Sequence, residues 1–439
     1  MGVRLGKTKS KKRRGRVMKK LAISGLVLLL ILGVQSSSFA AEKAKLTVLV
    51  PTKFSPGTNE MFRHNVSEWG KVKGVDVSVE ETSYGALSRR ARAAAEEKRG
   101  PDIMEAPALL AALYHESLIE VDDVATELGN KYGGWYPVTE TLSKVGGHWK
   151  AIPVNLENHA IMIRKDLLDA AGEKVPPADW TWEDLLRIAK KIKLTTGLAG
   201  AGFSKGPAIG DASNFAYALL WSYGGKTVEA DGKTIALDSP ETRAALSFVK
   251  RLYDETEIPG VLEWNDLSNN KVYLAGLVGM TGNSGSLYAM AKKENPYVRN
   301  NTAIQIYPRG PGGQKFFTGM YSLGIFKHTQ YPDLAKDLIR YLFEKERYES
   351  WIATSDGNLS PALREFANHP IWKDPNLKAF VEANNYKAAL GYPGPVTREA
   401  AQVMDSMIII DMMGKVCRGV PIDDSIKWAV GEMKKIHNK

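Results

Sequence analysis

The residue patterns that most often carry catalysis are all incomplete in this sequence. Gly282-Asn-Ser-Gly-Ser286 approaches the Gly-x-Ser-x-Gly turn of a nucleophilic serine, but a serine stands where the last glycine is needed. His115-Glu116 is followed by Ser-Leu-Ile, so the second histidine of a zinc-protease helix is absent. Gly225-Lys-Thr227 and Gly232-Lys-Thr234 lack the upstream glycine of a phosphate-binding loop. We therefore expect that the protein is not an enzyme.

The seven histidines are scattered along the chain and show no spacing that is typical of metal ligands. We expect each of them to be structural or exposed, and we expect neither a metal nor a cofactor. Polar residues that directly follow apolar runs remain as candidates for binding. Thr52, Lys53 and Phe54 follow the first such run, and Glu105 follows the third. Open α/β sheets bind ligands at the carboxyl ends of their strands, although loop structure alone is the alternative for these residues.

Alternating strands and helices are predicted to position these residues. Residues 46–50 form a short apolar run ended by a proline, residues 75–79 alternate valine with polar side chains, and residues 102–104 begin a third strand. A helix-compatible segment ends near Trp69, and residues 86–98 are rich in alanine, arginine and glutamate, which favour helices. This βαβαβ order implies a parallel sheet with helices on its faces.

The second half of the chain carries further helix signals. Residues 181–184 resemble a capping box with aspartate in the glutamate position, and apolar residues follow at a spacing that gives one buried face over 185–192. Ser239-Pro-Glu241 supplies an N-cap, a first-turn proline and an acid, and Pro332 opens a helix with an apolar face over 335–342. Since a single core stops growing near about 250–300 residues, we predict two α/β domains.

The first forty residues have the pattern of a signal peptide. The first twenty include ten basic residues and no acid, and an uncharged apolar run follows over 21–34. Small residues at Ser38 and Ala40 predict cleavage between Ala40 and Ala41. A membrane anchor is the alternative, but an anchor needs about 20 apolar residues and this run is shorter. Met18 is an alternative start of translation.

The signal peptide also explains the basic charge of the chain. The sequence has 59 basic and 49 acidic residues, so removing the ten basic residues of the leader leaves equal numbers of each. A neutral mature protein gives no electrostatic reason to bind nucleic acid, and we expect no nucleic-acid partner.

The single cysteine, Cys417, excludes an intramolecular disulfide. No cysteine follows the apolar run of the leader, so the signal for a lipid anchor is missing and we expect a protein that is not a lipoprotein. An exported protein without an anchor is retained by an outer membrane, which predicts a periplasmic location.

Four blocks in order carry a family resemblance. Gly100-Pro-Asp-Ile-Met104 with Leu118-Ile-Glu-Val-Asp122 resembles the block that ends the third strand of the family. The second block is matched by Gly147-His-Trp-Lys-Ala-Ile-Pro153, which is followed by Glu157 and by the helix start Trp180-Thr-Trp-Glu-Asp-Leu-Leu186. The third and fourth blocks are Leu277-Val-Gly-Met-Thr-Gly-Asn283, and Gly319-Met-Tyr-Ser-Leu-Gly-Ile325 with Pro332-Asp-Leu-Ala-Lys336.

Read together, these blocks resemble extracellular solute-binding protein family 1, the group that contains maltose-binding protein. The resemblance implies a periplasmic-binding-protein-like fold of class II, with two α/β lobes, a hinge and a ligand cleft between the lobes. It implies an N-lobe of residues 41–152 plus 312–352 and a C-lobe of residues 153–308 plus 355–439. The chain would then cross between the lobes near 152–155, 307–311 and 353–358.

The resemblance and the strand ends together nominate ligand-binding residues. For Asp211 or Asn214, the alternative to ligand binding is capping of a helix, and for Glu157 it is a position on the surface. Trp221 and Trp351 are expected to pack in the core. The nominated residues are Thr52, Lys53, Phe54, Glu105, Asn155, Glu157, Asn158, Asp211, Asn214, Asn283, Ser284, Ser286, Tyr321, Arg364 and Tyr392.

The function implied is the periplasmic solute-binding component of an ABC importer that takes a mono- or oligosaccharide to permease subunits in the inner membrane, as a monomer. In maltose-type members an aromatic platform follows the third block, but here Asn283 is followed by Ser-Gly-Ser. Stacking would have to come from Phe54, Trp135, Tyr321 or Tyr392. A non-sugar solute (polyol phosphate, polyamine or organic anion), a receptor for a sensor kinase and an extracytoplasmic lyase or hydrolase on the same fold stay open.

Overall fold

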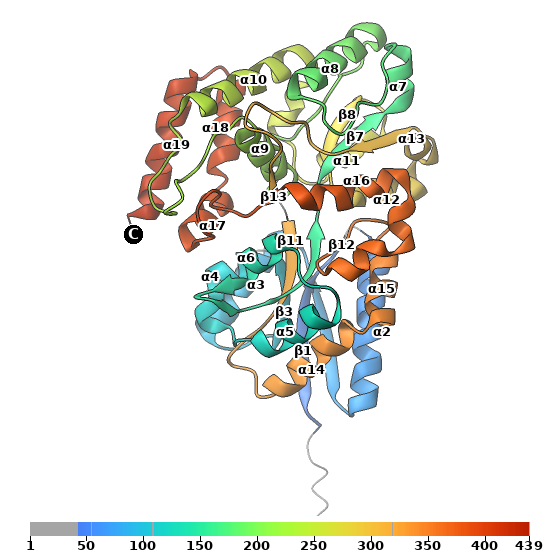
Figure 1. The fold of residues 1–439 in the computed structure, drawn as a ribbon, viewed down its shortest axis with the longest axis vertical. Helices are drawn as coiled ribbons and strands as arrows, with labels where there is room; N and C mark the ends of the chain where they lie inside the picture. The colour runs from blue at the N-terminus through green and yellow to red at the C-terminus, as the bar shows by residue number, and fades with distance from the viewer. Residues whose placement is uncertain (1–42, 54, 108, 318, 439) are drawn as a thin grey trace, which may run out of the picture. The chain divides into compact units, whose positions relative to one another are not determined.

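The computed structural model describes residues 43–438 with the exceptions of 54, 108 and 318. The predicted signal peptide and the predicted ligand residue Phe54 lie outside the described residues. Residues Lys45–Lys439 form one compact unit (Figure 1). Among the residues described, no helix is both long enough and apolar enough to cross a membrane.

A six-stranded sheet, here called the N-sheet, contains the strands predicted near the start of the chain. Strand β1 pairs in parallel with β2 and β3, so the predicted βαβαβ unit is confirmed, with α2 (Pro56–Lys73) and α3 (Tyr84–Glu97) as its helices. Strand β11 is antiparallel to both β3 and β6 and inserts between them. The order across the sheet is β12 (Ser360–Pro361), β6 (Ile152–Glu157), β11 (Gly319–Ile325), β3 (Ile103–Pro107), β1 (Lys45–Pro51) and β2 (Asp76–Thr82).

The core of this part lies between the N-sheet and its helices. Leu87, Ala91 and Ala94 repeat along one face of α3 and pack against Leu49 and Met104 of the sheet. This spacing places all three side chains on one side of the helix, which explains why the segment folds onto the strands. The neighbouring helices of this half are α4 (Leu109–Tyr114), α5 (Asp122–Lys131), α6 (Pro137–Ser143), α14 (Pro332–Leu342) and α15 (Lys345–Ala353).

A three-stranded antiparallel sheet, here called the C-sheet, organises the other half. Strand β7 (Ala160–Arg164) lies between β8 (Met280–Asn283) and β9 (Thr302–Gln305). The predicted capping box is confirmed, because the Thr181 hydroxyl accepts the Asp184 N–H at 3.1 Å and the Asp184 carboxylate accepts the Thr181 N–H at 3.0 Å.

The other predicted helices of the second half are confirmed as well. The Ser239 hydroxyl caps the helix that begins at Pro240, and the apolar face predicted over 335–342 is buried. The helices around the C-sheet and beyond it are α7 (Lys165–Ala170), α8 (Trp182–Thr196), α9 (Asp211–Ser222), α10 (Pro240–Thr256), α11 (Ser268–Leu274), α12 (Gly285–Glu294), α13 (Pro296–Asn300), α16 (Pro375–Glu382), α17 (Arg398–Asp405), α18 (Ile408–Cys417) and α19 (Ile422–His437).

Short strands and 3-10 turns complete the fold. Strand β10 (Phe316–Phe317) pairs in parallel with β13 (Lys387–Ala388), and β4 (Lys144–Val145) pairs with β5 (His148–Trp149). The 3-10 turns are η1 (His115–Ser117), η2 (Pro259–Leu262), η3 (Arg364–Asn368), η4 (Pro370–Lys373) and η5 (Ala383–Tyr386).

The passages between the two sheets fall later in the chain than the sequence suggested. Strand β6 stays in the N-sheet through Glu157, so the first passage lies at 158–159 and not at 152–155. Pro153 is accommodated inside β6 because the register with β11 shifts at this point, which is a bulge. Strand β12 also joins the N-sheet, so the later passage follows residue 361 and not 353–358.

Candidate functional site

A buried ion pair joins two of the predicted residues at neighbouring strands, although Glu105 lies within its strand and not after it as predicted. Lys53 follows β1, Glu105 lies in the adjacent parallel strand β3, and the Lys53 ammonium contacts Oε1 of Glu105. Both side chains are almost fully buried, and Oε2 of Glu105 has no hydrogen-bond partner among the described residues. The Lys53 Nζ also lies 4.7 Å from the centre of the Tyr321 ring and 5.7 Å from that of Trp351.

Glu157, the last residue of β6, lies in the same part of the N-sheet. It is opposite Gly319 of β11, where an added Cβ would come within 3.2 Å of the Glu157 side chain. Burial raises the pKa of Glu157 to about 7, an effect opposed by Lys53 and by a hydrogen bond with Tyr321. At neutral pH this carboxyl group is therefore close to half protonated.

Asn155 lies two residues before Glu157 on β6, so both side chains are on the same face of the N-sheet. The Asn155 side chain is buried, and neither its Nδ2 nor its Oδ1 has a hydrogen-bond partner in the described part of the chain. Buried amides are nearly always hydrogen-bonded in proteins, so this pair of atoms is a candidate for hydrogen bonds with a ligand.

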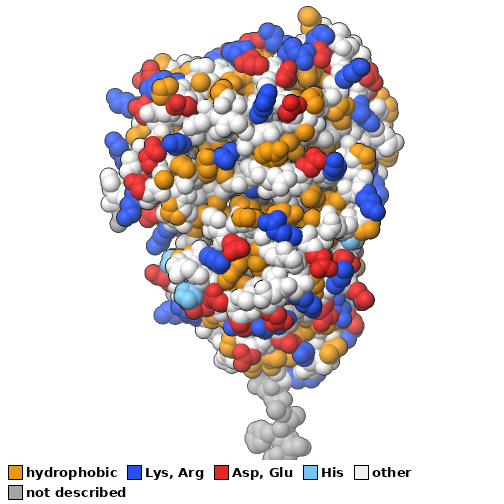
Figure 2. All heavy atoms as spheres, viewed as in Figure 1, with side chains coloured by type: hydrophobic (Ala, Val, Ile, Leu, Met, Phe, Trp, Pro, Cys, Tyr) orange, Lys and Arg blue, Asp and Glu red, His pale blue; other side chains and the backbone are white. Residues whose placement is uncertain are grey.

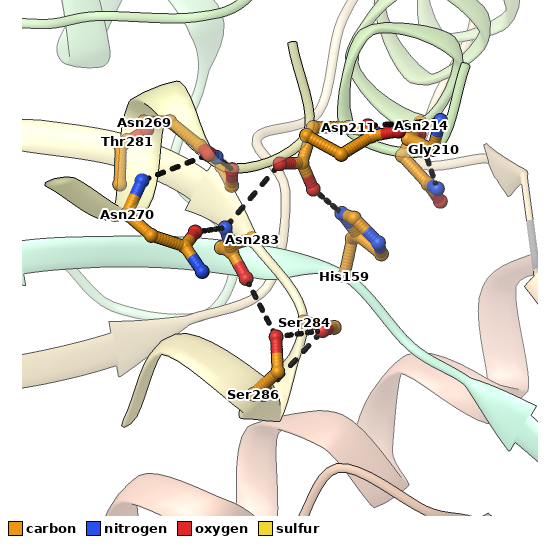
Figure 3. Close-up of polar contacts among 12 residues, drawn as sticks. His159, Gly210, Asp211, Asn214, Asn269, Asn270, Thr281, Asn283, Ser284 and Ser286 are labelled. Carbon is orange, nitrogen blue, oxygen red and sulfur yellow. Dashed lines mark hydrogen bonds and ion pairs between the residues drawn. The ribbon is translucent and has the colours of Figure 1, made fainter. Parts of the chain in front are cut away.

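A second cluster of predicted residues gathers at the ends of β8 and α9 beside the C-sheet (Figure 3). The Asn283 amide donates to Asn270 Oδ1 at 2.6 Å and to Asp211 Oδ2 at 3.4 Å. Asn283 Oδ1 accepts the Ser286 hydroxyl at 3.2 Å, and Ser286 lies 2.8 Å from the hydroxyl of Ser284. These side chains form one connected polar network in which donors and acceptors are both present.

Local structure also accounts for part of this cluster. The Ser284 hydroxyl accepts the Ser286 N–H and thereby caps α12, and Asn214 donates to the Gly210 carbonyl at 2.9 Å. Asp266 accepts the N–H groups of Gly210 and Asp211 at 3.1 and 3.0 Å, so it caps α9. The Oδ1 of Asn214 keeps no hydrogen-bond partner within the described residues.

His159 belongs to this cluster, although the sequence gave no reason to select it. Its Nδ1 lies 3.4 Å from Asp211 Oδ1, and the two side chains point toward one another (Figure 3). Burial lowers the pKa of His159 to about 3, with Lys387 adding to the effect, so the ring is neutral. His159 follows Asn155 and Glu157 at a spacing of two residues. In an extended chain this spacing places side chains on one side, so it could have indicated His159 as a site residue.

The two clusters lie within electrostatic range of each other. Burial raises the pKa of Asp211 well above its ordinary value, and the Asp266 and Glu157 carboxylates raise it further. Asp266 likewise raises the pKa of Glu157. Side chains from the N-sheet and from the elements beside the C-sheet thus form one buried polar region, which we call the polar site.

Several predicted residues lie outside the polar site. Thr52 is exposed, and Arg364 is exposed with its guanidinium 5.0 Å from the ring of Tyr136. Tyr392 packs edge-on against Trp221, with 5.6 Å between ring centres. The predicted residue Asn158 is buried, and its amide donates to the Phe380 carbonyl and to Asn384 Oδ1.

The aromatic residues proposed for stacking separate in the same way. Trp135 is in the core beside Trp149, with ring centres 5.5 Å apart, while Tyr321 borders Lys53 and Glu157. Trp351 is buried as expected and also approaches Lys53. A surface groove of about 640 Å³ between α8 and α10, lined by Glu183, Arg187 and Arg251 among others, contains none of the predicted residues.

The molecular face in Figure 2 carries basic and acidic side chains intermixed, without a broad area of one sign. This distribution agrees with the balanced charge expected after removal of the leader.

Known proteins resemble the chain in sequence. The model of the family described as bacterial extracellular solute-binding protein matches residues 66–379. A protein of Brucella abortus (strain 2308) that is named a binding protein is 29% identical over 207 residues, which are 46% of this chain and 49% of that relative. The chain thus spans about half the length of the Brucella relative. YcjN of Escherichia coli (strain K12), named an ABC transporter periplasmic-binding protein, is 25% identical over 279 residues, 62% of each chain.

Solved structures resemble it in fold. The maltose-bound MalE3 of T. maritima has a TM-score of 0.77 at 20% identity and covers 90% of this chain and 100% of its own. The GacH receptor of Streptomyces glaucescens GLA.O, solved unliganded and with acarbose, has a TM-score of 0.76 at 19% identity over 90% of this chain and 99% of its own. A solute-binding protein of Agrobacterium radiobacter K84 in complex with ribitol has a TM-score of 0.74 at 20% identity, and the match covers 90% of this chain and 98% of that protein. The predicted α/β fold of this class is confirmed by these likenesses.

Proposed function

The chain belongs to the bacterial extracellular solute-binding proteins, and from that premise we propose that it is the periplasmic component of an ABC importer and binds a carbohydrate. The observation that carries the proposal is the polar site, in which side chains from both halves of the fold lie within electrostatic range and several buried polar atoms have no hydrogen-bond partner among the described residues. The family is one of solute-binding proteins, in agreement with the expectation that the chain is not an enzyme.

The chemistry of the polar site suits a molecule with many hydroxyl groups. Each hydroxyl both donates and accepts a hydrogen bond, and the polar site offers amides, hydroxyls and carboxylates for both roles. Asn155 and Asn214 supply, on the two sides, buried atoms that have no hydrogen-bond partner within the described residues. The ring of Tyr321 beside Lys53 supplies an aromatic face of the kind that packs against the C–H face of a sugar.

Binding would couple to closure of two lobes built on the N-sheet and the C-sheet. The chain passes directly from one sheet to the other at 158–159, between Glu157 and His159, so the passage itself carries side chains of the polar site. A solute that contacts both sides favours the arrangement in which they meet. Permease subunits in the inner membrane would then recognise this closed, monomeric state, and no bond is made or broken.

The known relatives support this assignment by analogy. The structures named above were solved with maltose, acarbose and ribitol, which are carbohydrates or a polyol. The Escherichia coli relative is named an ABC transporter periplasmic-binding protein. The periplasmic location of this chain rests on the signal peptide predicted over residues 1–40.

A thermal-shift screen of the protein without residues 1–40 tests the proposal. Sugars, polyols, carboxylates and simple amines are compared, and a sugar at about 100 times its Kd should stabilise the fold by about 2.7 kcal/mol. The variant Asn155→Ala should lose most of this shift, whereas the exposed Asn130→Ala on α5 should retain it. Stabilisation by non-carbohydrates alone, or turnover of a stabilising compound, would refute the proposal.

A further inference from the structure

Charges in the polar site are not balanced. Four carboxylates, those of Glu105, Glu157, Asp211 and Asp266, interact there, and Lys53 contacts Glu105 and lowers the pKa of Glu157. The ammonium of Lys53 is in direct contact with Glu105. Within the described residues, no lysine or arginine forms an ion pair with any of the other three.

Asp266 has a structural role that explains its charge. It caps the first N–H groups of α9, where the helix dipole favours a negative group. Asp211 has no comparable role, because that end of α9 is already capped. Its carboxylate lies between His159 and Asn283 at 3.4 Å from each (Figure 3), and both partners are neutral. A buried carboxylate whose hydrogen-bond partners are neutral and whose nearby charges are other carboxylates is costly unless a cation joins it.

Unpartnered acceptors occur on the elements of the polar site. Asn214 follows Asp211 by three residues on α9, and its Oδ1 is buried without a hydrogen-bond partner among the described residues. The Tyr307 hydroxyl is likewise without a partner there, and burial, with the Asp211 charge adding to it, raises its pKa. On β6, Oδ1 of Asn155 has no partner within the described part of the chain. Such acceptors suit a group that donates several hydrogen bonds.

The remaining nearby cation does not neutralise these carboxylates. Lys387 of β13 acts on His159, and its Nζ lies 3.4 Å from the Phe317 carbonyl. Burial lowers the pKa of Lys387 to about 7, and none of the carboxylates of the polar site opposes this change.

We propose that the solute is a carbohydrate carrying a protonated amine, an amino sugar, whose ammonium group is held by Asp211 and Glu157 with the free acceptors around them. The inference rests on the proposed function and names the substrate class of the same site. An ammonium group supplies three N–H donors and the positive charge that the polar site lacks. Hydroxyls of the same molecule would use Asn283, Ser286 and Asn155.

Isothermal titration calorimetry with matched probes tests this inference. The pairs are glucose with glucosamine and cellobiose with the chitosan disaccharide, while N-acetylglucosamine keeps the nitrogen without its charge and putrescine keeps the charge without hydroxyls. We expect each amine-bearing sugar to bind at least about tenfold tighter than its neutral counterpart.

Two variants assign the preference to the carboxylates. Asp211→Asn keeps the shape of the side chain and removes its charge, so the ratio between the affinities for the amine-bearing and the neutral sugar should fall to about one. Glu157→Gln should reduce the preference as well. Asp254→Asn, on the exposed face of α10 beside Lys250, serves as the control and should bind as the wild type does. Because Asp211→Asn removes a carboxyl group whose charged form is disfavoured by burial, its unfolding midpoint should not fall below that of the wild type.

The possible outcomes separate this inference from the proposed function. Tighter binding of the amine-bearing sugars that is lost in Asp211→Asn supports the inference. Equal or tighter binding of the neutral sugars overturns it and leaves the sugar-binding function standing. Binding of putrescine as tight as that of the amino sugars overturns the amino-sugar assignment, and binding of putrescine without binding of any sugar overturns the carbohydrate function as well.

Discussion

Replacing Glu157 with glutamine should remove a pH-dependent part of the folding free energy. Burial raises the pKa of Glu157 from its ordinary value of 4.5 to about 7, and Asp266 and Glu105 add to the rise while Lys53 and Tyr321 oppose it. The folded state therefore binds this proton more tightly than the unfolded state does. The stabilisation is fully present below pH 4.5 and is lost as the pH rises through about 7.

The size of the effect follows from the pKa change. A rise from 4.5 to about 7 corresponds to about 3 kcal/mol of unfolding free energy, since one pKa unit equals about 1.4 kcal/mol. Burial lowers the pKa of His159 to about 3 and that of Lys387 to about 7, and both changes make the folded state more stable as the pH rises. Asp211 has a raised pKa and acts in the same direction as Glu157. The difference in unfolding free energy between wild type and Glu157→Gln isolates the contribution of Glu157.

Urea denaturation followed by tryptophan fluorescence, repeated from about pH 4.5 to about pH 8, measures this difference. The unfolding free energy of the wild type minus that of Glu157→Gln should fall by about 3 kcal/mol across the series. A Glu60→Gln variant, which changes an exposed side chain on α2, should follow the wild-type curve. Parallel curves for wild type and Glu157→Gln would show that Glu157 is solvated in the folded protein, and the reasoning would fail.

Three further predictions concern groups outside this titration. Lys53→Met leaves Glu105 buried without its partner and should lower the unfolding free energy by about 3–5 kcal/mol in urea titrations, with partial recovery in a double variant that also carries Glu105→Leu. Thr181→Ala removes half of a capping box and should cost about 1 kcal/mol by the same assay. Burial raises the pKa of the Cys417 thiol to about 12, so iodoacetamide near pH 8 should alkylate it only after unfolding; rapid reaction of the native protein would contradict the structure.

Local sequence signals predicted the elements of this fold well because their causes are local. The capping box at 181–184 and the apolar spacing that follows it fix both the start and the buried face of α8. Lys53 and Glu105 were nominated because each is at or just beyond the end of a predicted strand, and parallel strands bring such ends together.

Other features of the polar site depend on long-range packing and left no local trace. Asp266 lies between α10 and α11 and reaches the polar site because it caps α9, more than fifty residues earlier in the chain. Arg364 and Tyr392 were nominated by residue type, but they pack against Tyr136 and Trp221. The sequence of a loop has no periodicity from which the direction of an arginine or tyrosine side chain could be predicted. The passage at 158–159 was placed too early because the bulge that accommodates Pro153 forms only against β11.

The same carboxylates give a physical reason for coupling between solute and closure under the proposed function. Glu157 belongs to the N-sheet and Asp211 to a helix beside the C-sheet, so bringing the two halves together without a solute buries like charges. Burial raises the pKa of both groups, and the charge of Glu157 adds to the rise for Asp211. An ammonium group between them reverses the sign of the interaction, because it is attracted to both carboxylates only when they are close. A cationic solute therefore has greater affinity for the closed state than for the open one, and that difference is what shifts the population toward closure.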